Sequence, residues 1–266
     1  MIIGCFATAV FGQETAPPAQ LASAESVHIN AHAHNDYYHT RPLLDALQQG
    51  FGSIEADVFL VNGELQVAHS SFETRAERTL EKLYLEPLAA RCEANGGRVY
   101  DGEVELILLV DLKTEAEATY ARLLEQLARF ESMLTKLVDG KVQSGAVCVI
   151  VSGNRPVETM AKQAWRLAFL DGRIPDLDAN TAVQLVPLVS DAWTNHFTWR
   201  GRGTMPPEEA DKLEALVAKA HGQNRKLRFW GAPDNPATWE ELAASGVDLI
   251  NTDKLQELAQ FLAARR

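Results

Sequence analysis

The sequence predicts a (β/α)8 barrel, the TIM-barrel fold, as a single catalytic domain over residues 26–266. About eight apolar segments with strand character alternate with helical patterns over about 240 residues, which matches the size and element number of this fold. One segment, Val104–Leu112, is almost continuously apolar, as expected for a strand of a parallel sheet that is covered on both faces. A doubly wound open sheet is the alternative, but the Gly-x-Gly-x-x-Gly motif of that fold does not follow the first strand.

The expected strands are short apolar runs that are bounded by turn or helix signals. After the second of them, Asn62-Gly63 signals a tight turn that returns the chain as a hairpin towards His69. In chain order the eight predicted strands are Ser26–Ala31, Gly52–Leu60, Val104–Leu112, Ala146–Val151, Leu167–Leu170, Val183–Val189, Leu227–Trp230 and Val247–Asn251.

The expected helices lie between these strands. One is predicted by an apolar stripe at positions i, i+3, i+4 and i+7, whose members are Tyr120, Leu123, Leu124 and Leu127. Another opens at Pro206-Pro207, because proline is favoured in the first turn of a helix. The remaining predicted helices are Pro42–Gln49, Ala237–Ala244 and Lys254–Ala264.

The N-terminal segment predicts export. Residues 1–12 are apolar, carry no charge and end in small residues, which is typical of a signal peptide, and residues 13–25 form a linker rich in proline and alanine. We therefore expect a periplasmic or secreted protein. Lipoprotein anchoring through Cys5 is the alternative.

The composition of the chain limits the kinds of molecule that it is expected to bind. The formal net charge of −11 argues against binding to nucleic acid. No stretch approaches the roughly 18–20 apolar residues that cross a bilayer, so no transmembrane segment is expected. The sequence leaves the oligomeric state open. The expected partner is a small-molecule substrate.

Two acidic residues in one apolar strand give the strongest chemical signal. Glu55 and Asp57 stand at i and i+2, so they point to the same face of the strand and repel each other unless a positive group lies between them. Asp111, at the end of the next long strand, can add a third oxygen ligand. A hard divalent cation, Mg2+ or Ca2+, is the occupant that prefers such oxygen ligands.

Further polar residues follow the predicted strands, and catalytic groups of a barrel gather at the carboxyl ends of its strands. They come from different strands, which is a pattern that favours an active site. The candidates for acid–base catalysis and substrate binding are His32, His34, Asn35, His69, Lys113, Asn154, Arg155 and Trp230.

Two histidines beside a cation held by three carboxylates suit phosphodiester cleavage. One neutral imidazole accepts the proton of the nucleophile, and the other, protonated, donates to the leaving oxygen. The pattern His32-Ala33-His34 also opens the zinc sites of amidohydrolase-type barrels, but the middle strands supply no further histidine. A barrel that holds an ion and a ligand without catalysis is the other alternative.

These motifs resemble the phosphodiesterase superfamily of phosphatidylinositol phospholipase C and the glycerophosphodiester phosphodiesterases. Within it, the chain is most similar to the branch of altered inheritance of mitochondria protein 6 homologues. The superfamily resemblance is carried by Ala31-His32, Gly50, Ser53–Val58, Ala68-His69, Asp111–Thr114 and Gly246–Asp253. The similarity to the branch is carried by His32–Tyr37, Gly153–Pro156, Pro187–Ser190 and Trp199–Gly201.

The resemblance implies a metal-dependent phosphoric diester hydrolase that acts on a lipid-derived or other small phosphodiester. It implies His32 and His69 as the acid–base pair, Mg2+ or Ca2+ on the three carboxylates, and Lys113 near the phosphate. The glycerophosphodiesterase pattern has His-Arg-Gly after the first strand, where this chain has His32-Ala33-His34. His34 is therefore the rival of His32 for the catalytic role.

Overall fold

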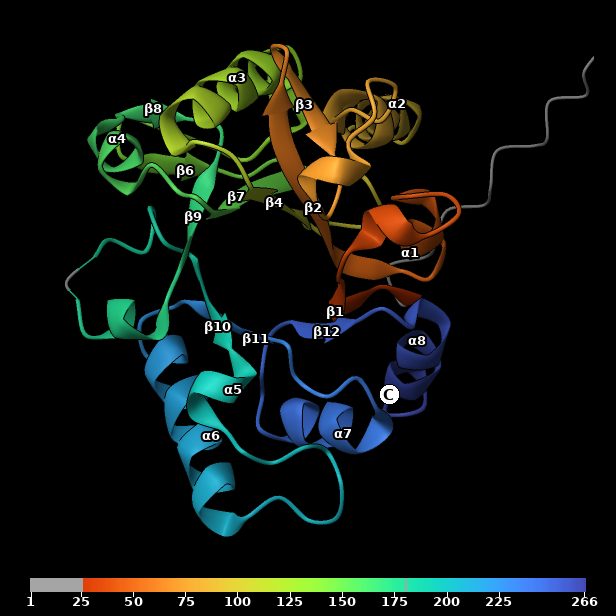
Figure 1. The fold of residues 1–266 in the computed structure, drawn as a ribbon, viewed down its shortest axis with the longest axis vertical. Coiled ribbons are helices and arrows are strands. Elements are labelled where there is room, and N and C mark those ends of the chain that lie inside the picture. The colour runs from red at the N-terminus through yellow and green to blue at the C-terminus, as the bar shows by residue number, and fades with distance from the viewer. Residues whose placement is uncertain (1–25, 180) are drawn as a thin grey trace, which may run out of the picture.

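The predicted barrel is confirmed by a computed structural model, which describes residues 26–179 and 181–266 (Figure 1). Parallel strands form a nearly closed wall, with helices on the outside. The strands of the wall are β1 (His28–Ala33), β2 (Phe51–Val61), β4 (Leu106–Leu112), β7 (Val147–Gly153), β9 (Phe169–Gly172), β10 (Leu188–Ala192), β11 (Lys226–Trp230) and β12 (Ile250–Thr252).

The order of the strands places the first strand of the barrel beside the last. Strand β1 pairs in parallel with β2 on one side and with β12 on the other, where Ala31 lies opposite Ile250. Figure 1 shows red β1 beside blue β12. A single parallel bridge between Arg228 and Leu249 joins β11 to the last strand and completes the ring.

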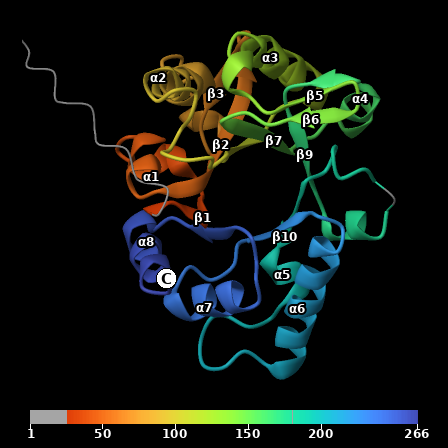
Figure 2. The ribbon, with the colours of Figure 1, turned by 180° about the vertical axis from the view of Figure 1, so that it is seen from behind.

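The helices cover the outer face of this wall, as both views show (Figures 1 and 2). No helix in the described part of the chain combines the length and apolarity that a membrane span needs. The helices are α1 (Leu44–Gln48), α2 (Glu86–Ala94), α3 (Ala116–Ala128), α4 (Val157–Lys162), α5 (Trp193–His196), α6 (Pro207–His221), α7 (Pro236–Ala244) and α8 (Leu255–Ala263).

Strand alternation divides the buried residues into two cores. In β4, Leu106, Leu108 and Val110 belong to the large core between wall and helices. The intervening residues Ile107 and Leu109 belong to a smaller core inside the barrel. Because side chains alternate along a strand, the next inward position of β4 is Asp111. The alternation that points apolar side chains into the barrel therefore also points a carboxylate inward near the carboxyl end of β4.

Several strand boundaries differ from the prediction. Strand β1 ends at Ala33 instead of Ala31, so His32 lies within the strand and not after it. Strand β10 begins at Leu188, where the sequence predicted a strand from Val183. The pattern also did not indicate the small antiparallel sheet of β5 (Lys136–Val138), β6 (Lys141–Gln143) and β8 (Trp165–Arg166). The hairpin after Asn62-Gly63 forms as predicted, with β3 (Glu64–Val67) antiparallel to β2.

A buried carboxylate holds the loop that follows β1. Asp36 is fully buried, and its Oδ2 accepts hydrogen bonds from the Leu43 backbone N–H at 2.5 Å and from the Tyr84 hydroxyl at 2.9 Å. Leu43 has a positive φ of 65°. The two hydrogen bonds fix this turn against the rest of the barrel, and with it the neighbouring residues of the strand end.

Asp36→Asn should change the pH dependence of folding. Burial raises the pKa of Asp36 from 3.8 to about 6, so between these values the folded protein keeps a proton that the unfolded chain has released. The free energy of unfolding therefore falls as pH rises through this window. The free energy of unfolding of Asp36→Asn, relative to that of the native protein, should therefore rise by up to about 3 kcal/mol between pH 4 and pH 7.

Urea unfolding at both pH values measures this difference. The exposed Asp101→Asn is the matched control and should run parallel to the native protein. Parallel behaviour of Asp36→Asn would contradict the buried, proton-retaining carboxyl.

Candidate active site

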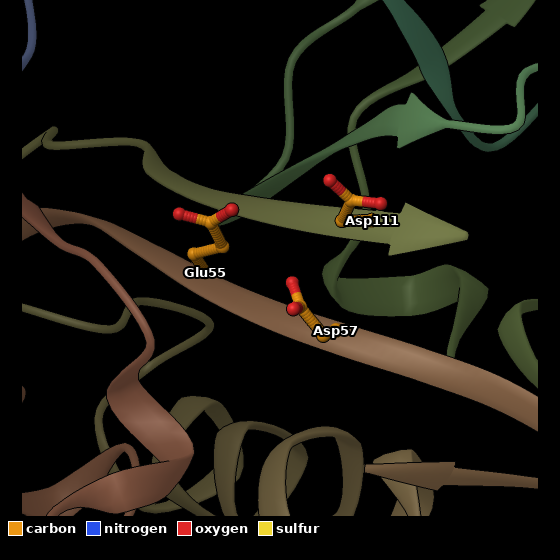
Figure 3. Close-up of side chains that lie close together, drawn as sticks. All are labelled: Glu55, Asp57 and Asp111. Atoms are coloured by element: carbon orange, nitrogen blue, oxygen red, sulfur yellow. The ribbon is translucent and has the colours of Figure 1, made fainter. Parts of the chain in front are cut away.

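Three carboxylates from two neighbouring strands lie close together, as Figure 3 shows. Glu55 and Asp57 come from β2 and Asp111 from β4, and in the register of the two strands Asp57 lies directly opposite Asp111. One oxygen of each side chain lies within 4.8 Å of the others. Sequence spacing predicted this group, because i and i+2 in a strand share a face.

Glu55 is held as a carboxylate by two partners. Its Oε2 accepts a hydrogen bond from Arg228 Nη2 at 2.8 Å and lies 3.0 Å from His32 Nε2. Burial alone would raise the pKa of Glu55, but the Arg228 guanidinium and the His32 hydrogen bond outweigh it and hold the pKa well below its usual range. Arg228 is itself buried and also donates to Asn251 Oδ1 at 2.8 Å.

The negative charges of Asp57 and Asp111 are offset less completely than that of Glu55. The Lys113 ammonium lies 3.0 Å from Asp57 Oδ2 and 3.2 Å from Asp111 Oδ1, and these carboxylates keep the pKa of Lys113 raised despite its partial burial. Burial and the negative charge of Glu55 nevertheless raise the pKa of Asp57 to about 6. Burial also raises the pKa of Asp111. This part of the cluster has negative charge that Lys113 does not fully offset.

The glycine at the end of β7 makes room for one of these carboxylates. Gly153 has a positive φ of 68°, and a Cβ at this position would overlap Asp111 Oδ1 and the Leu112 carbonyl oxygen. Strands β4 and β7 are paired along this stretch, with Leu112 opposite Gly153. The position therefore has to be glycine for the Asp111 carboxylate to keep its orientation.

His32, the preferred catalytic histidine, does not line the cavity. It is fully buried inside the barrel wall, with Nδ1 2.7 Å from Ser53 Oγ and Nε2 3.0 Å from Glu55 Oε2. Burial, together with the positive charge of Arg228, lowers the pKa of His32 to about 4. Both ring nitrogens of this neutral histidine are occupied. His32 lies in the wall because β1 continues two residues further than predicted.

His34 and His69 are the histidines that face the cavity. His34 Nδ1 lies 2.9 Å from Asp253 Oδ1, and this contact outweighs the effect of burial and raises the pKa of His34. His69 Nδ1 lies 3.1 Å from the Tyr37 hydroxyl, which in turn lies 2.8 Å from Asp57 Oδ2. The side chain of His69 is 55% exposed and that of His34 is 30% exposed, so a ligand can reach both rings.

The cavity above the carboxylates has a volume of about 270 Å3. It brings together residues from most of the strand ends, including Asn35, Lys113 and Trp230 as predicted for substrate binding. The full set of lining residues is His34, Asn35, Glu55, Asp57, His69, Asp111, Lys113, Ser152, Arg173, Arg228 and Trp230.

Two predicted substrate-binding residues do not line this cavity. Asn154 is exposed, and its side-chain amide donates to the Thr114 carbonyl at 2.9 Å. Arg155 donates to the Asp171 carbonyl. Both therefore stabilise loops around the site.

Sequence reasoning missed three lining residues, Ser152, Arg173 and Arg228. Ser152 stands two residues after Ile150 and Arg173 four after Phe169, both of which belong to the inner core. Arg228 alternates with Leu227 and Phe229, which belong to the outer core. Counting inward positions by two would have found them.

The carboxylate cluster fits a hard divalent cation. Its donors are all oxygens, and the buried Asp57 Oδ1 accepts no hydrogen bond from any described residue. A buried carboxylate oxygen without a partner is costly unless a positive group lies beside it. Within residues 26–179 and 181–266, this is the one group of acidic, histidine or cysteine side chains close enough to share a metal, and it contains no histidine, which does not favour the zinc alternative.

Comparison with known proteins identifies the family. A model of the AIM6-like phosphodiesterase domain matches residues 21–171, more than half of the sequence. The chain belongs to this family. A second model, of the glycerophosphoryl diester phosphodiesterase family, matches residues 226–256, which hold β11 and β12. The resemblance that the motifs predicted is therefore confirmed.

Fungal relatives align over most of the chain. Altered inheritance of mitochondria protein 6 of Eremothecium gossypii is 29% identical over 93% of this chain and 74% of its own length. A homologue in Arthroderma benhamiae is 29% identical over 85% of this chain and 82% of its own length. The protein of this name in Saccharomyces cerevisiae is 28% identical, over 84% and 68% respectively.

Solved structures share the fold. A glycerophosphodiester phosphodiesterase from Parabacteroides distasonis aligns with a TM-score of 0.54 at 15% identity, covering 89% of this chain and 97% of its own. One from Agrobacterium tumefaciens aligns with a TM-score of 0.51 at 16% identity, covering 89% and 100%. At this identity the similarity shows the barrel and nothing finer.

The names of the relatives contradict the predicted location. The fungal proteins are named for altered inheritance of mitochondria, an association with an organelle, so the expectation of a periplasmic or secreted protein was wrong. The predicted signal peptide over residues 1–12 and the linker over 13–25 lie outside the described residues.

Gly153→Ala should weaken binding of a divalent cation, because the added methyl group displaces the Asp111 carboxylate. We expect an affinity loss of about tenfold or more for Mg2+ and Ca2+, measured by calorimetric titration. Gly63→Ala is the matched control: its φ is also positive, at 81°, but no atom lies within 4 Å of the added Cβ. Gly63→Ala should lose about 1 kcal/mol of folding stability through backbone strain. Gly153→Ala should lose more, because its added methyl group also overlaps the Leu112 carbonyl oxygen. Unchanged affinity in Gly153→Ala would show that Asp111 does not ligate the ion.

Proposed function

We propose that the protein is a metal-dependent phosphoric diester hydrolase that cleaves a lipid-derived or other small phosphodiester with two histidines as acid and base. The observation that supports it best is the arrangement of one cavity, in which three carboxylates, Lys113 and two accessible histidines face the same space. Membership of a phosphodiesterase family supports the reaction class.

The cluster of Glu55, Asp57 and Asp111 would hold the cation. A bound Mg2+ or Ca2+ supplies positive charge that polarises the phosphoryl group and offsets the charge that develops on it. Lys113, beside two of the carboxylates, is placed to bind a non-bridging phosphoryl oxygen. Arg228 remains with Glu55 and keeps that carboxylate charged and oriented.

His34 and His69 are the acid–base pair in this proposal, in place of His32 and His69. The raised pKa of His34 favours its protonated form, which can donate to the leaving alkoxide through Nε2 while Nδ1 stays with Asp253. When Tyr37 donates its single hydrogen to Asp57, the Tyr37 oxygen accepts from His69 Nδ1–H. This leaves the His69 Nε2 lone pair to accept the proton of the nucleophile. His32 acts as a positioning residue behind Glu55.

Replacing each histidine in turn tests this assignment. With glycerophosphocholine as substrate and Mg2+ or Ca2+ present, His34→Gln and His69→Gln should each lower kcat about 100-fold or more. His32→Gln should mainly lower stability, because Glu55 and Ser53 lose a buried partner. A loss of kcat confined to His32→Gln, with the fold intact, would restore the pair that the sequence predicted. No hydrolysis of any diester by the metal-loaded native protein would refute the proposed function.

Asp253→Asn should shift the pH profile of the reaction. The general acid must be protonated, so kcat/KM should fall as pH rises through the pKa of His34. Asp253 raises this pKa, and removing its charge should move the alkaline limb of the profile to lower pH. Asp248→Asn, which contacts the remote His221, is the control and should leave the profile unchanged. An unmoved alkaline limb in Asp253→Asn would contradict the role of His34.

A further inference from the structure

The cavity wall formed by β9 and the residue after it carries an arginine that is held from behind by a buried carboxylate. Asp171 is fully buried. Its Oδ2 accepts hydrogen bonds from Ser152 Oγ at 2.7 Å, Ser190 Oγ at 2.5 Å and Arg173 Nη1 at 2.9 Å. The same nitrogen of Arg173 also donates to the Gly172 carbonyl at 2.8 Å. Three neighbouring strands, β7, β9 and β10, thus contribute to one support.

These contacts orient the Arg173 guanidinium and leave some of its N–H donors available to a ligand. A buried carboxylate is costly unless it is paired, and Asp171 is paired by two hydroxyl groups and one guanidinium nitrogen. All hydrogen bonds of the guanidinium to described residues are made through Nη1. The side chain is 28% exposed and lines the cavity, so Nη2 and Nε remain for a ligand. A fixed planar guanidinium with two free donors matches a carboxylate or a phosphate.

Among the described residues, Arg173 pairs with Asp171 and with none of the three clustered carboxylates. The strands run around the barrel in the order β1, β2, β4, β7, β9, β10, β11 and β12, so β9 stands opposite β1 and two strands beyond β4. The carboxylates and Lys113 belong to β2 and β4, and they already provide for the scissile phosphoryl group. Arg173 thus adds a positive charge to the cavity that the carboxylates do not neutralise.

We propose that Arg173 forms a second anion subsite, and that the substrate is a phosphodiester whose alcohol carries a further anionic group, a carboxylate or a phosphate ester. The inference rests on the proposed function and adds the substrate class to it. The scissile phosphoryl group lies at the carboxylate cluster and the second anionic group pairs with Arg173 across the cavity of about 270 Å3. Trp230, which is 42% exposed, lines the same cavity and packs against the part between the two charges.

Two diesters that differ by one carboxylate test the subsite. Glycerophosphoserine and glycerophosphoethanolamine share every other group. The native protein with Mg2+ or Ca2+ should show a kcat/KM about tenfold or more higher for the serine diester, as expected for one charge-assisted pair. Arg173→Gln should abolish this preference, because it should lower kcat/KM about tenfold more for the serine diester than for the ethanolamine diester. Glycerophosphoglycerol phosphate should show the same dependence on Arg173 if the second group can be a phosphate ester.

Two variants keep the test informative. Arg173→Lys retains the charge next to Asp171 and should fold normally, but it loses the planar pair of donors and should keep only part of the preference. Arg122→Gln removes one positive charge from α3, where its partners are Glu64 and Glu125, and should change nothing. Equal losses for both diesters in Arg173→Gln would place Arg173 on the scissile phosphoryl group and overturn the proposal, as would the absence of any preference in the native protein.

Binding without turnover separates this proposal from the proposed function. Calorimetric titration of the chelator-treated native protein and of Arg173→Gln with both diesters needs no catalysis. A preference for glycerophosphoserine that Arg173→Gln removes would support the subsite even if no diester is hydrolysed. Equal affinities of the native protein for the two diesters would overturn it even if both are hydrolysed.

Discussion

The structure depends on how three carboxylates are accommodated inside one barrel. Glu55, Asp57 and Asp111 lie on inward positions of adjacent strands, and their mutual repulsion in a poorly solvated interior would be large if nothing opposed it. Arg228 and Lys113 oppose it from two sides. The cluster is therefore part of a charge network that spans the barrel from β11 to β4.

Arg228 and Lys113 have different roles in this network because their side chains are buried to different degrees. The side chain of Arg228 is 3% exposed and is fixed by Glu55 and Asn251, so it is a permanent member of the wall. The side chain of Lys113 is 29% exposed and shared by Asp57 and Asp111. It is a flexible point charge that can follow an incoming anion without leaving a carboxylate fully unpaired. Glu55 thus stays rigid, while the other two carboxylates can respond to a ligand.

The sequence was sufficient to predict the position of a side chain wherever local spacing along a strand determines that position. The spacing of Glu55 and Asp57 predicted a shared face, and the apolar run ending in Asp111 predicted the neighbouring strand that completes the cluster. It was not sufficient where position depends on the exact end of a strand. Two additional residues in β1 moved His32 from the expected rim into the wall and left His34 at the cavity. Strand ends are set by tertiary pairing, here with Ser53 and Asn251 of the neighbouring strands, which no local pattern records.

The support behind Arg173 could not be predicted from the sequence, for a related reason. Nothing in the local sequence shows that Ser152 and Ser190, each 19 residues from Asp171, hold that carboxylate behind the arginine. Such a network is defined by strand order. Predicting it from one sequence requires the barrel register, which in turn requires the strand ends.

The number of paired positions between neighbouring strands differs around the barrel. Strands β2, β4 and β7 are paired along most of their length. On the other side, β9 meets β10 through the pairs Asp171–Leu188 and Gly172–Val189, and one bridge closes the seam between β11 and β12. Sparse pairing lowers the cost of local opening. Strand β9, which leads to Arg173, has two paired positions with each neighbour, so local opening costs less there than in the continuously paired strands that carry the carboxylates.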